Sequence, residues 1–343
     1  MPIRKRSTFV IIFIVFFCFI SNILIAQQGR IVEDKIHSAS LEGNLLNDPA
    51  TRPMAIYLPP SYDEGDKLYP VIYYLHAYSD SYTAWSFSIK SVIDTLIQQS
   101  KVQDMIIVMP DGTNKYGGSW YSNSSVAGNY EDYITKDLIE FIDSKYRTLP
   151  QRESRAIGGG SMGGYGAMKL AMKHPEAYCA VVSHSGLLSI NHWKDIVRAN
   201  PQSMQSFAIA WSPNPNSDSL CDYPADAKGN LLEDVWNRWL ANDVVSMVKS
   251  YQGNLKKLAG IYFDHGKQDT TVNISEAQEF DKVLTEAGIS HIYEGYSGGH
   301  GDQWTSRLYI AIPFLSNLLS SEGLTSVKPK GKLTTTWGEM KIK

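Results

Sequence analysis

Three short apolar runs, separated by segments with helical periodicity, restrict the fold of this chain more than any other feature of its sequence. The runs contain few polar residues, which is typical of strands buried on both faces, and they cover residues 71–75, 105–109 and 180–183. Between them, residues 88–99 and 133–146 carry apolar side chains every three or four positions. Strands that alternate with such helices form β-α-β units, so we expect a mostly parallel central sheet with helices on both faces.

Further elements extend this sheet at both of its sequence ends. Ahead of the apolar runs we expect two antiparallel leading strands, and after them a strand, a helix, a strand and a last helix. These segments cover residues 31–46, 53–58, 261–264, 275–287, 291–296 and 304–319. Together they predict one α/β domain over residues 27–321.

One segment interrupts the alternation of strands and helices. Residues 187–251 are irregular, rich in Asn, Pro, Asp and Ser, and hold four of the eight tryptophans of the chain: Trp193, Trp211, Trp236 and Trp239. Because so long an irregular segment inside a compact domain is usually functional, we interpret it as a lid-like insertion between two strands of the sheet.

The two ends of the chain fall outside this domain. Residues 1–26 have the layout of a signal peptide, with basic residues at 4–6, an apolar run at 9–20 and a small residue, Ala26, before Gln27. We therefore expect a secreted or periplasmic protein without a stable membrane partner after cleavage; an uncleaved N-terminal anchor is the alternative. Residues 322–343 contain five lysines and little apolar surface, which indicates a C-terminal tail.

Charge and cysteine content exclude several classes of partner. The formal net charge of −3 gives no general attraction to phosphate backbones, so we expect no nucleic-acid partner. Cys179 and Cys221 lack the spaced Cys and His neighbours of a zinc site, and we expect neither a metal nor an organic cofactor. An oxidising compartment would permit a disulfide between the two, but Cys179 opens an apolar strand, which favours a buried free thiol.

The strongest local signal is the sequence Gly159-Gly160-Ser161-Met162-Gly163-Gly164. It matches the pattern G-x-S-x-G, with a strand-like stretch before it and a helical stretch after it. A serine exposed on a sharp strand-to-helix turn needs small neighbours, and the start of the helix favours negative charge on a reaction intermediate. We therefore predict that Ser161 is a nucleophile.

A serine nucleophile needs a general base, and in this arrangement an acid and then a histidine follow the serine in the chain. Asp269 and His300 meet this order, because each lies in a loop directly after a predicted strand. His184 also follows a strand and is the alternative base. Asp264 is the alternative acid, but it still lies on its strand.

The oxyanion hole and the substrate contacts complete the predicted site. Backbone N–H groups of Met162 and Tyr78 are the expected oxyanion donors, with Ala77 as the alternative to Tyr78. Trp120, Tyr121 and Trp304 are the expected substrate-binding residues, since indole and phenol rings stack on sugars and phenolic acids. The competing interpretation is that most of these aromatic residues belong to the core.

The motifs of this chain resemble those of the esterase D-like putative esterases, over most of residues 53–319. This group includes S-formylglutathione hydrolases, feruloyl and acetylxylan esterases, enterochelin esterases and mycolyltransferases. The resemblance depends on seven groups of residues: Tyr69–His76, Met109-Pro110-Asp111-Gly112, Ser119-Trp120-Tyr121, Tyr130-Glu131-Asp132-Tyr133, Ser161–Ala167, His174-Pro175-Glu176, and Gly266 with Asp269 and Gly299-His300. It implies the α/β-hydrolase fold and the same catalytic positions. Members usually have Gly where this chain has Ala77, which affects the oxyanion loop.

These observations predict an exported serine esterase that acts through an acyl-enzyme on a small-molecule or polysaccharide ester. A feruloyl or acetyl ester of xylan is the expected substrate, because export and the aromatic residues near the site favour an ester on a carbohydrate. An acyltransferase with the same triad is one alternative. A non-catalytic carbohydrate-binding protein on a hydrolase fold is another.

Overall fold

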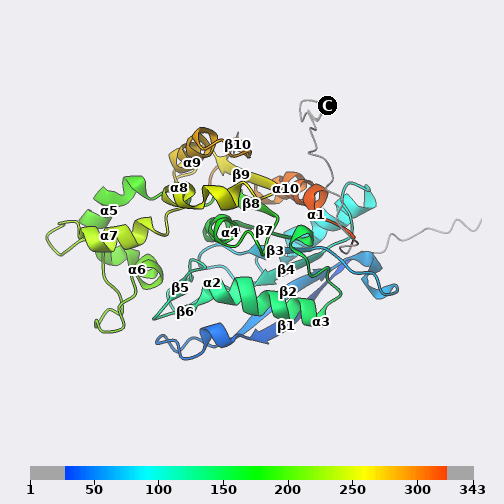
Figure 1. Cartoon of the computed structure of the whole chain (residues 1–343), viewed down its shortest axis with the longest axis horizontal. Coiled ribbons are helices and arrows are strands. Elements are labelled where there is room, and N and C mark those ends of the chain that lie inside the picture. Colours follow the sequence, from blue (N-terminus) through cyan, green and yellow to red (C-terminus); the bar gives the residue numbers. More distant parts are fainter. Residues whose placement is uncertain (1–27, 323–343) are drawn as a thin grey trace, which may run out of the picture.

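The computed structural model of the chain describes residues 28–322, and its centre is one eight-stranded sheet (Figure 1). The strand order is β1-β2-β4-β3-β7-β8-β9-β10. β1 and β2 pair with antiparallel neighbours, and the strands from β4 to β10 are parallel. Their bounds are β1 Arg30–His37, β2 Thr51–Leu58, β3 Val71–Leu75, β4 Ile106–Pro110, β7 Arg155–Gly160, β8 Ala180–His184, β9 Gly260–Gly266 and β10 Ile292–Tyr296. The mostly parallel sheet expected from the apolar runs is confirmed.

Helices cover both faces of the sheet, because the side chains of each buried strand alternate between two apolar clusters. On β3, Ile72 and Tyr74 join the cluster under α1 and α10, whereas Val71 and Tyr73 join the larger cluster on the other face. α1 (Ser86–Gln98) and α10 (Trp304–Leu318) form the first layer. The opposite layer contains α3 (Leu138–Lys145), α4 (Met162–Lys173), α8 (Val244–Leu255) and α9 (Ile274–Glu286).

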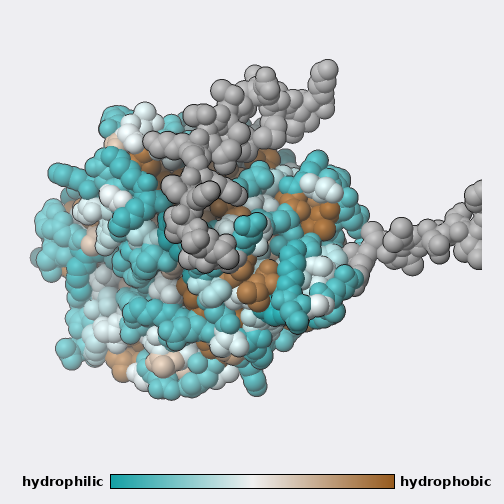
Figure 2. Space-filling model, turned by 45° about the vertical axis from the view of Figure 1, so that its right-hand side comes forward, coloured by the Kyte–Doolittle hydropathy of each residue, from teal (hydrophilic) through white to brown (hydrophobic). Residues whose placement is uncertain are grey.

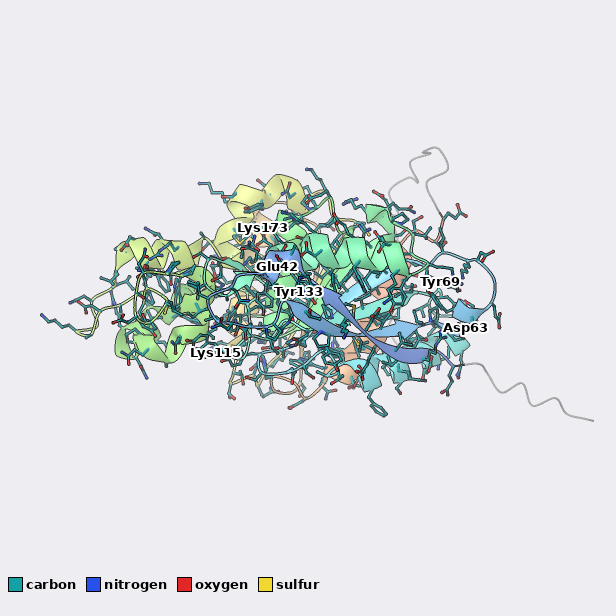
Figure 3. All side chains as sticks on the ribbon, turned by 90° about the horizontal axis from the view of Figure 1, so that it is seen from below. Glu42, Asp63, Tyr69, Lys115, Tyr133 and Lys173 are labelled. Atoms are coloured by element: carbon teal, nitrogen blue, oxygen red, sulfur yellow. The ribbon has the colours of Figure 1, made fainter. Side chains whose placement is uncertain are left out.

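Short elements connect these layers. They are η1 (Ala39–Leu41), η2 (Pro60–Asp63), β5 (Asn123–Ser124), β6 (Gly128–Asn129), α2 (Tyr130–Asp132), the π-helical η3 (Tyr133–Asp137) and η4 (Arg152–Ser154). The expected helix over 133–146 therefore begins with a π turn. The first leading strand ends at His37 rather than near 46, because η1 and turns follow it. In the view from below, the fully buried Tyr133 lies near the middle of the molecule (Figure 3).

Between β8 and β9 the chain forms a small helical subdomain, residues 187–243, which we call the cap. It contains η5 (Asn191–Trp193), α5 (Lys194–Ala199), η6 (Pro201–Met204), α6 (Gln205–Trp211) and α7 (Glu233–Leu240), at the left of Figure 1. The expected insertion extended to residue 251. Residues 244–251 instead lie in α8, which packs on α4 and α9 and so belongs to the layer that covers the sheet.

The cap tryptophans pack mostly on one another and on Phe207, and Trp211 also packs on the body. Trp211, Trp236 and Trp239 are buried, whereas Trp193 is partly buried and packs on Phe207. The indole of Trp211 also contacts Tyr165 of α4, with ring centroids 5.5 Å apart. Three of the four large rings are therefore used for packing and have little surface to offer a ligand.

The predicted signal segment, residues 1–26, and residues 323–343 of the predicted tail lie outside the described residues. Over residues 28–322, no helix is both long and apolar enough to cross a membrane. The face shown in Figure 2 is mostly hydrophilic, with separate apolar patches. Cys179 and Cys221 are buried free thiols, and burial raises the pKa of the Cys179 thiol to about 11.

Candidate active site

Ser161 occupies a sharp turn between the end of β7 and the start of α4. Its backbone has φ 52° and ψ −117°, a conformation that costs a non-glycine residue roughly 1–3 kcal/mol. The turn is tight because α4 approaches the end of β3: a Cβ on Gly163 would collide with the carbonyl of Leu75. The Ser161 N–H donates to the carbonyl oxygen of His184 (2.8 Å), which fixes the turn against β8. The sequence thus stores strain at this serine, a pattern that clusters at functional sites.

The loops that carry the other predicted residues converge on this turn. β3, β7, β8, β9 and β10 are parallel, so their carboxyl ends lie along one edge of the sheet. The oxyanion loop follows β3, the serine follows β7, Asp269 follows β9 and His300 follows β10. Ligand sites of open α/β sheets form at this edge.

Asp269 and His300 form a hydrogen-bonded pair in these loops. His300 Nδ1 lies 2.7 Å from Asp269 Oδ2. Because the carboxylate can only accept, Nδ1 carries the proton and Nε2 is left as the basic nitrogen. Asp269 is buried, while the His300 side chain is 20% exposed, so the imidazole stays accessible at the edge of the site.

The surroundings of Asp269 keep it ionised. Burial alone would raise the pKa of this carboxyl, but hydrogen bonds from His265, His300 and the Val272 N–H together lower the pKa well below its ordinary value. Oδ1 accepts from the N–H groups of Thr271 (2.8 Å) and Val272 (2.9 Å). The carboxylate can therefore stabilise a positive charge on His300.

Trp304 connects His300 with the serine turn. Its ring centroid lies 5.5 Å from that of His300, and a Cβ built on Gly160 would lie 3.2 Å from the same indole. In the described part of the chain, no hydrogen bond joins Ser161 Oγ to His300. The serine–histidine bond that the sequence predicts therefore stays a prediction.

The oxyanion loop, residues 76–79, is held by hydrogen bonds on several sides. His76 Nδ1 donates to the carbonyl of Ala77 (2.8 Å), and His76 Nε2 accepts from the Gly112 N–H (2.8 Å). The Ser79 N–H donates to the Gly117 carbonyl (2.9 Å), and the Tyr78 hydroxyl donates to the Tyr116 carbonyl (2.6 Å). Tyr78 and Met162, the two expected donors, both pack on Gly118.

Ala77 fits this loop, at the position where the resemblance leads us to expect Gly. Among residues 28–322, the loop residue with a positive φ is Ser79 (60°) and not Ala77. Because Ala77 does not need the left-handed backbone conformation that favours glycine, its Cβ adds no backbone strain.

The three aromatic residues expected to bind substrate have different environments. Tyr121 is fully buried, and its hydroxyl donates to the His76 carbonyl (3.0 Å), so it supports the oxyanion loop and has no surface for a substrate. Trp120 is 5% exposed and stacks on both Tyr78 and Phe207, with ring centroids 5.9 and 3.9 Å away. Trp304 stays a candidate, because it is partly buried beside His300.

Two side chains near Ser161 and Asp269 have contacts that the sequence did not predict. The Tyr78 ring is 43% exposed beside Met162, although the sequence pointed only to its backbone. His265 contacts Asp269 Oδ2 (3.0 Å), and its spacing of four residues before Asp269 was a signal that could have suggested this.

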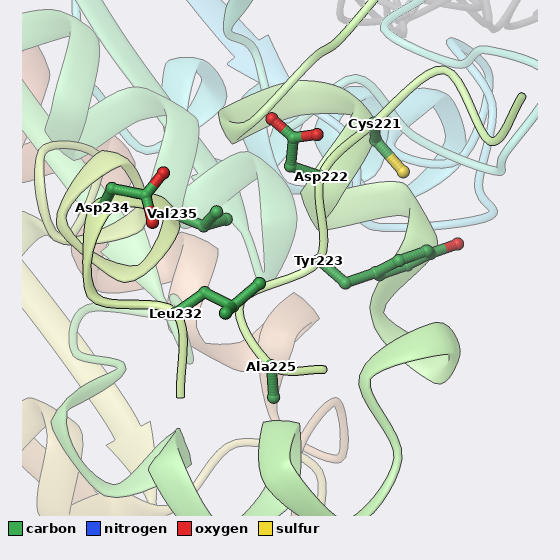
Figure 4. A pocket seen from close by; sticks show the side chains of 7 residues that line it. All are labelled: Cys221, Asp222, Tyr223, Ala225, Leu232, Asp234 and Val235. Atoms are coloured by element: carbon green, nitrogen blue, oxygen red, sulfur yellow. The ribbon is translucent and has the colours of Figure 1, made fainter. Parts of the chain in front are cut away.

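The open hollow shown in Figure 4 is not part of this site. It has a volume of about 420 Å³ and lies on the cap. Its lining residues are Cys221, Asp222, Tyr223, Ala225, Leu232, Asp234 and Val235. All of them belong to the cap, and the strand ends that carry Ser161 and its neighbours contribute none.

Comparison with known proteins agrees with this geometry. Residues 49–315 match the family model described as "Putative esterase". An esterase of Mycobacterium tuberculosis is 28% identical over 258 residues, which are 71% of this chain and 51% of the relative, so the chain spans about half the length of that protein. An acetyl esterase of Caldicellulosiruptor saccharolyticus is 23% identical over 248 residues, 72% of this chain and 83% of the relative.

Solved structures give the same result. A ferulic acid esterase superposes with a TM-score of 0.65 and 26% identity, covering 85% of this chain and 99% of that chain. An S-formylglutathione hydrolase from Agrobacterium tumefaciens has a TM-score of 0.61 at 17% identity, covering 86% and 97%, which is a likeness of fold.

Proposed function

This chain belongs to the putative esterase family and has the α/β-hydrolase fold, and on that premise we propose that it is a serine esterase. The observation that carries the proposal is the combination at one edge of the sheet of a strained serine and a buried, ionised aspartate paired with a histidine. This is the set that nucleophilic ester cleavage needs: a nucleophile, a base and a group that orients the base.

The proposed reaction has two halves. His300 Nε2 takes the proton of Ser161 Oγ, and the oxygen attacks the ester carbonyl carbon while N–H groups of Met162 and Tyr78 stabilise the oxyanion. The intermediate collapses, the C–O bond to the alcohol breaks, and His300 returns the proton to the leaving alcohol. The same histidine then takes a proton from water, and the resulting hydroxide attacks the acyl carbon; the C–O bond to Ser161 Oγ breaks, His300 returns the proton to Oγ, and the acid is released. The Asp269 charge stabilises the imidazolium in both halves.

We further propose that the substrate is an ester on a carbohydrate, with feruloyl or acetyl esters of xylan as the first candidates. Relatives named acetyl esterase and endo-1,4-beta-xylanase/feruloyl esterase, and the ferulic acid esterase structure, support this substrate class. The exposed Tyr78 ring and Trp304 supply flat surfaces on which a phenolic or sugar ring can stack. The signal-peptide pattern of residues 1–26 favours work outside the cytoplasm, where polysaccharides are found.

The test of the esterase proposal is Ser161→Ala with Ser185→Ala as a matched control. Ser185 is also a buried serine with a positive φ, directly after β8. Ser161→Ala is expected to lower kcat on p-nitrophenyl acetate by roughly 10⁴-fold or more with unchanged folding, whereas Ser185→Ala retains activity. Equal turnover by wild type and Ser161→Ala on every ester tested would leave only a binding role for the fold.

The test of the substrate class is the ring of Tyr78, since Ala and Phe at this position both keep the backbone N–H. Tyr78→Ala is expected to raise KM for methyl ferulate by roughly 10-fold, through the loss of stacking area, with little change for p-nitrophenyl acetate. Tyr78→Phe is the control that keeps the ring and removes the bond to Tyr116. A ratio of the two kcat/KM values that is the same in wild type and Tyr78→Ala contradicts the stacking role.

A further inference from the structure

We propose that His265 is a positioning residue that holds the Asp269 carboxylate in place for His300. The inference rests on the proposed esterase function and adds a second histidine on the catalytic acid. His265 Nε2 lies 3.0 Å from Asp269 Oδ2 and 2.9 Å from the Val272 carbonyl oxygen. Nε2 carries the proton and donates it to the Val272 carbonyl, and the same edge of the ring lies in polar contact with the Asp269 carboxylate.

His265 has a rigid support, unlike the histidine of the triad. It lies on β9, one residue before the end of the strand, and is fully buried. The neighbouring Asp264 faces α10, so His265 points to the opposite face of the sheet, toward the layer that contains α9. Its Nδ1 has no hydrogen-bond partner among the described residues, so all hydrogen bonding of the ring is directed at the turn of residues 269–272. The strand thereby fixes both ends of that turn.

The contacts of the carboxylate show what this donor contributes. Oδ1 is held by two backbone N–H groups, and Oδ2 is shared by His265 and His300. Without His265, Oδ2 would keep only its bond to His300, whose side chain is partly exposed. The other titratable groups affected by the Asp269 charge are Glu276 from α9 and Tyr296 from β10. His265 therefore acts on His300 through Asp269 and does not touch the substrate.

The test compares two side chains of similar length, His265→Met and His265→Gln. Methionine removes the donor, while the glutamine amide keeps an N–H for Asp269 and Val272. His265→Met is expected to lower kcat by about 10-fold with KM unchanged, and His265→Gln is expected to restore most of the loss. In His265→Met the acid limb of the plot of kcat/KM against pH should move to higher pH. Without His265 the negative charge of Asp269 acts on His300 alone, and it therefore favours the protonated form of His300 more strongly.

His291→Met is the matched control, because His291 also bonds one carbonyl and one carboxylate, those of Ile289 and Asp281, away from the site. It should change thermal stability alone. A purely structural role for His265 would do the same, leaving kcat per folded molecule and the acid limb unmoved, and that result overturns the proposal.

A double-mutant cycle between His265 and Asp269, measured as kcat, gives the second readout. On an Asp269→Asn background, His265→Met should cost little further activity, because the group through which it acts is already altered. Fully additive losses overturn the proposal. Should His265→Met not fold, His265→Gln decides: near-wild-type kcat supports the donor role, and a folded Gln variant as impaired as Asp269→Asn refutes it. Failure of the esterase proposal itself is seen separately, as activity that survives in Ser161→Ala.

Discussion

Two His–Asp pairs on neighbouring strands and loops, His300–Asp269 and His184–Asp264, differ in their burial, and only the first belongs to the proposed catalytic triad. His300 Nδ1 lies 2.7 Å from Asp269, and His184 Nδ1 lies 3.0 Å from both carboxylate oxygens of Asp264. In sequence the two histidines look alike, because each follows or ends a strand near glycines. The distances alone do not separate them either.

The surroundings of the two pairs separate them. His184 and Asp264 lie within β8 and β9 and are fully buried, and Arg307 of α10 donates to Asp264 (2.8 Å). His300 and Asp269 lie beyond the strand ends, where His300 keeps access to solvent and to Trp304. A His–Asp pair can thus serve as an internal ion cluster or as a base and its orienting acid. Position relative to the strand end decides which role is available.

The largest effect that distinguishes the pairs is on turnover. His300→Gln is expected to lower kcat by roughly 10³–10⁴-fold, because the general base is lost while the fold is untouched. His184→Gln is expected to keep activity within about three-fold per folded molecule, at a lower melting temperature. Kinetics on p-nitrophenyl acetate with a folded-fraction measurement check both. The reverse pattern would assign the base to His184.

How much of this the sequence could predict depends on whether a residue is fixed by local pattern or by contacts between distant segments. The strand runs, the turn at Ser161 and the chain order of Asp269 and His300 follow from periodicity and from glycine spacing, and the observed elements match them closely. The end of the cap could not be predicted in this way, because only the packing of α8 on α4 and α9 shows that residues 244–251 belong to the layer over the sheet. Burial of Tyr121 and of the cap tryptophans is likewise tertiary, since an aromatic residue near a motif suits a core and a pocket equally.

The second effect is on stability and concerns the internal pair. Asp264→Asn removes the charge that Arg307 and His184 face in a buried site, and breaking such a pair from one side costs roughly 3 kcal/mol of unfolding free energy. Activity per folded molecule is expected to persist. Chemical denaturation of wild type and Asp264→Asn measures the loss, with a change below about 0.5 kcal/mol contradicting it.

The pH dependence of this loss has a defined sign. Burial would raise the pKa of Asp264, but His184 and Arg307 lower it below its ordinary value. The Asp264 charge therefore contributes fully to the free energy of unfolding above the unfolded-state pKa of about 4, and this contribution is lost as the pH falls through the pKa of the folded state. The difference in unfolding free energy between wild type and Asp264→Asn should accordingly narrow below about pH 4.

Glu276 serves as a control, because its effect on stability should change with pH in the opposite direction. Burial raises the pKa of this carboxyl to about 8, so the folded protein keeps a proton that the unfolded chain has released. Glu276→Gln should match wild type at pH 4 and become relatively more stable as the pH rises toward 8. Parallel stability curves for either variant and wild type would contradict the assigned protonation states.

The smallest effect concerns the serines that follow β7 and β8. Ser161 (φ 52°) and Ser185 (φ 44°) both have a backbone conformation that favours glycine, but only Ser185 uses its hydroxyl, which lies 3.1 Å from the Tyr296 hydroxyl. Ser161→Gly should gain about 1 kcal/mol of stability over wild type, since relief of strain exceeds the added entropy of the unfolded chain. Ser185→Gly gains the same relief but loses a hydrogen bond of about 1 kcal/mol, so its net change is near zero. Each Gly variant should also be more stable than the Ala variant at its position, because alanine keeps the strain. If Ser161→Gly is no more stable than Ser161→Ala, the turn stores no strain at the serine, and the difference between the two strand ends is then one of chemistry alone.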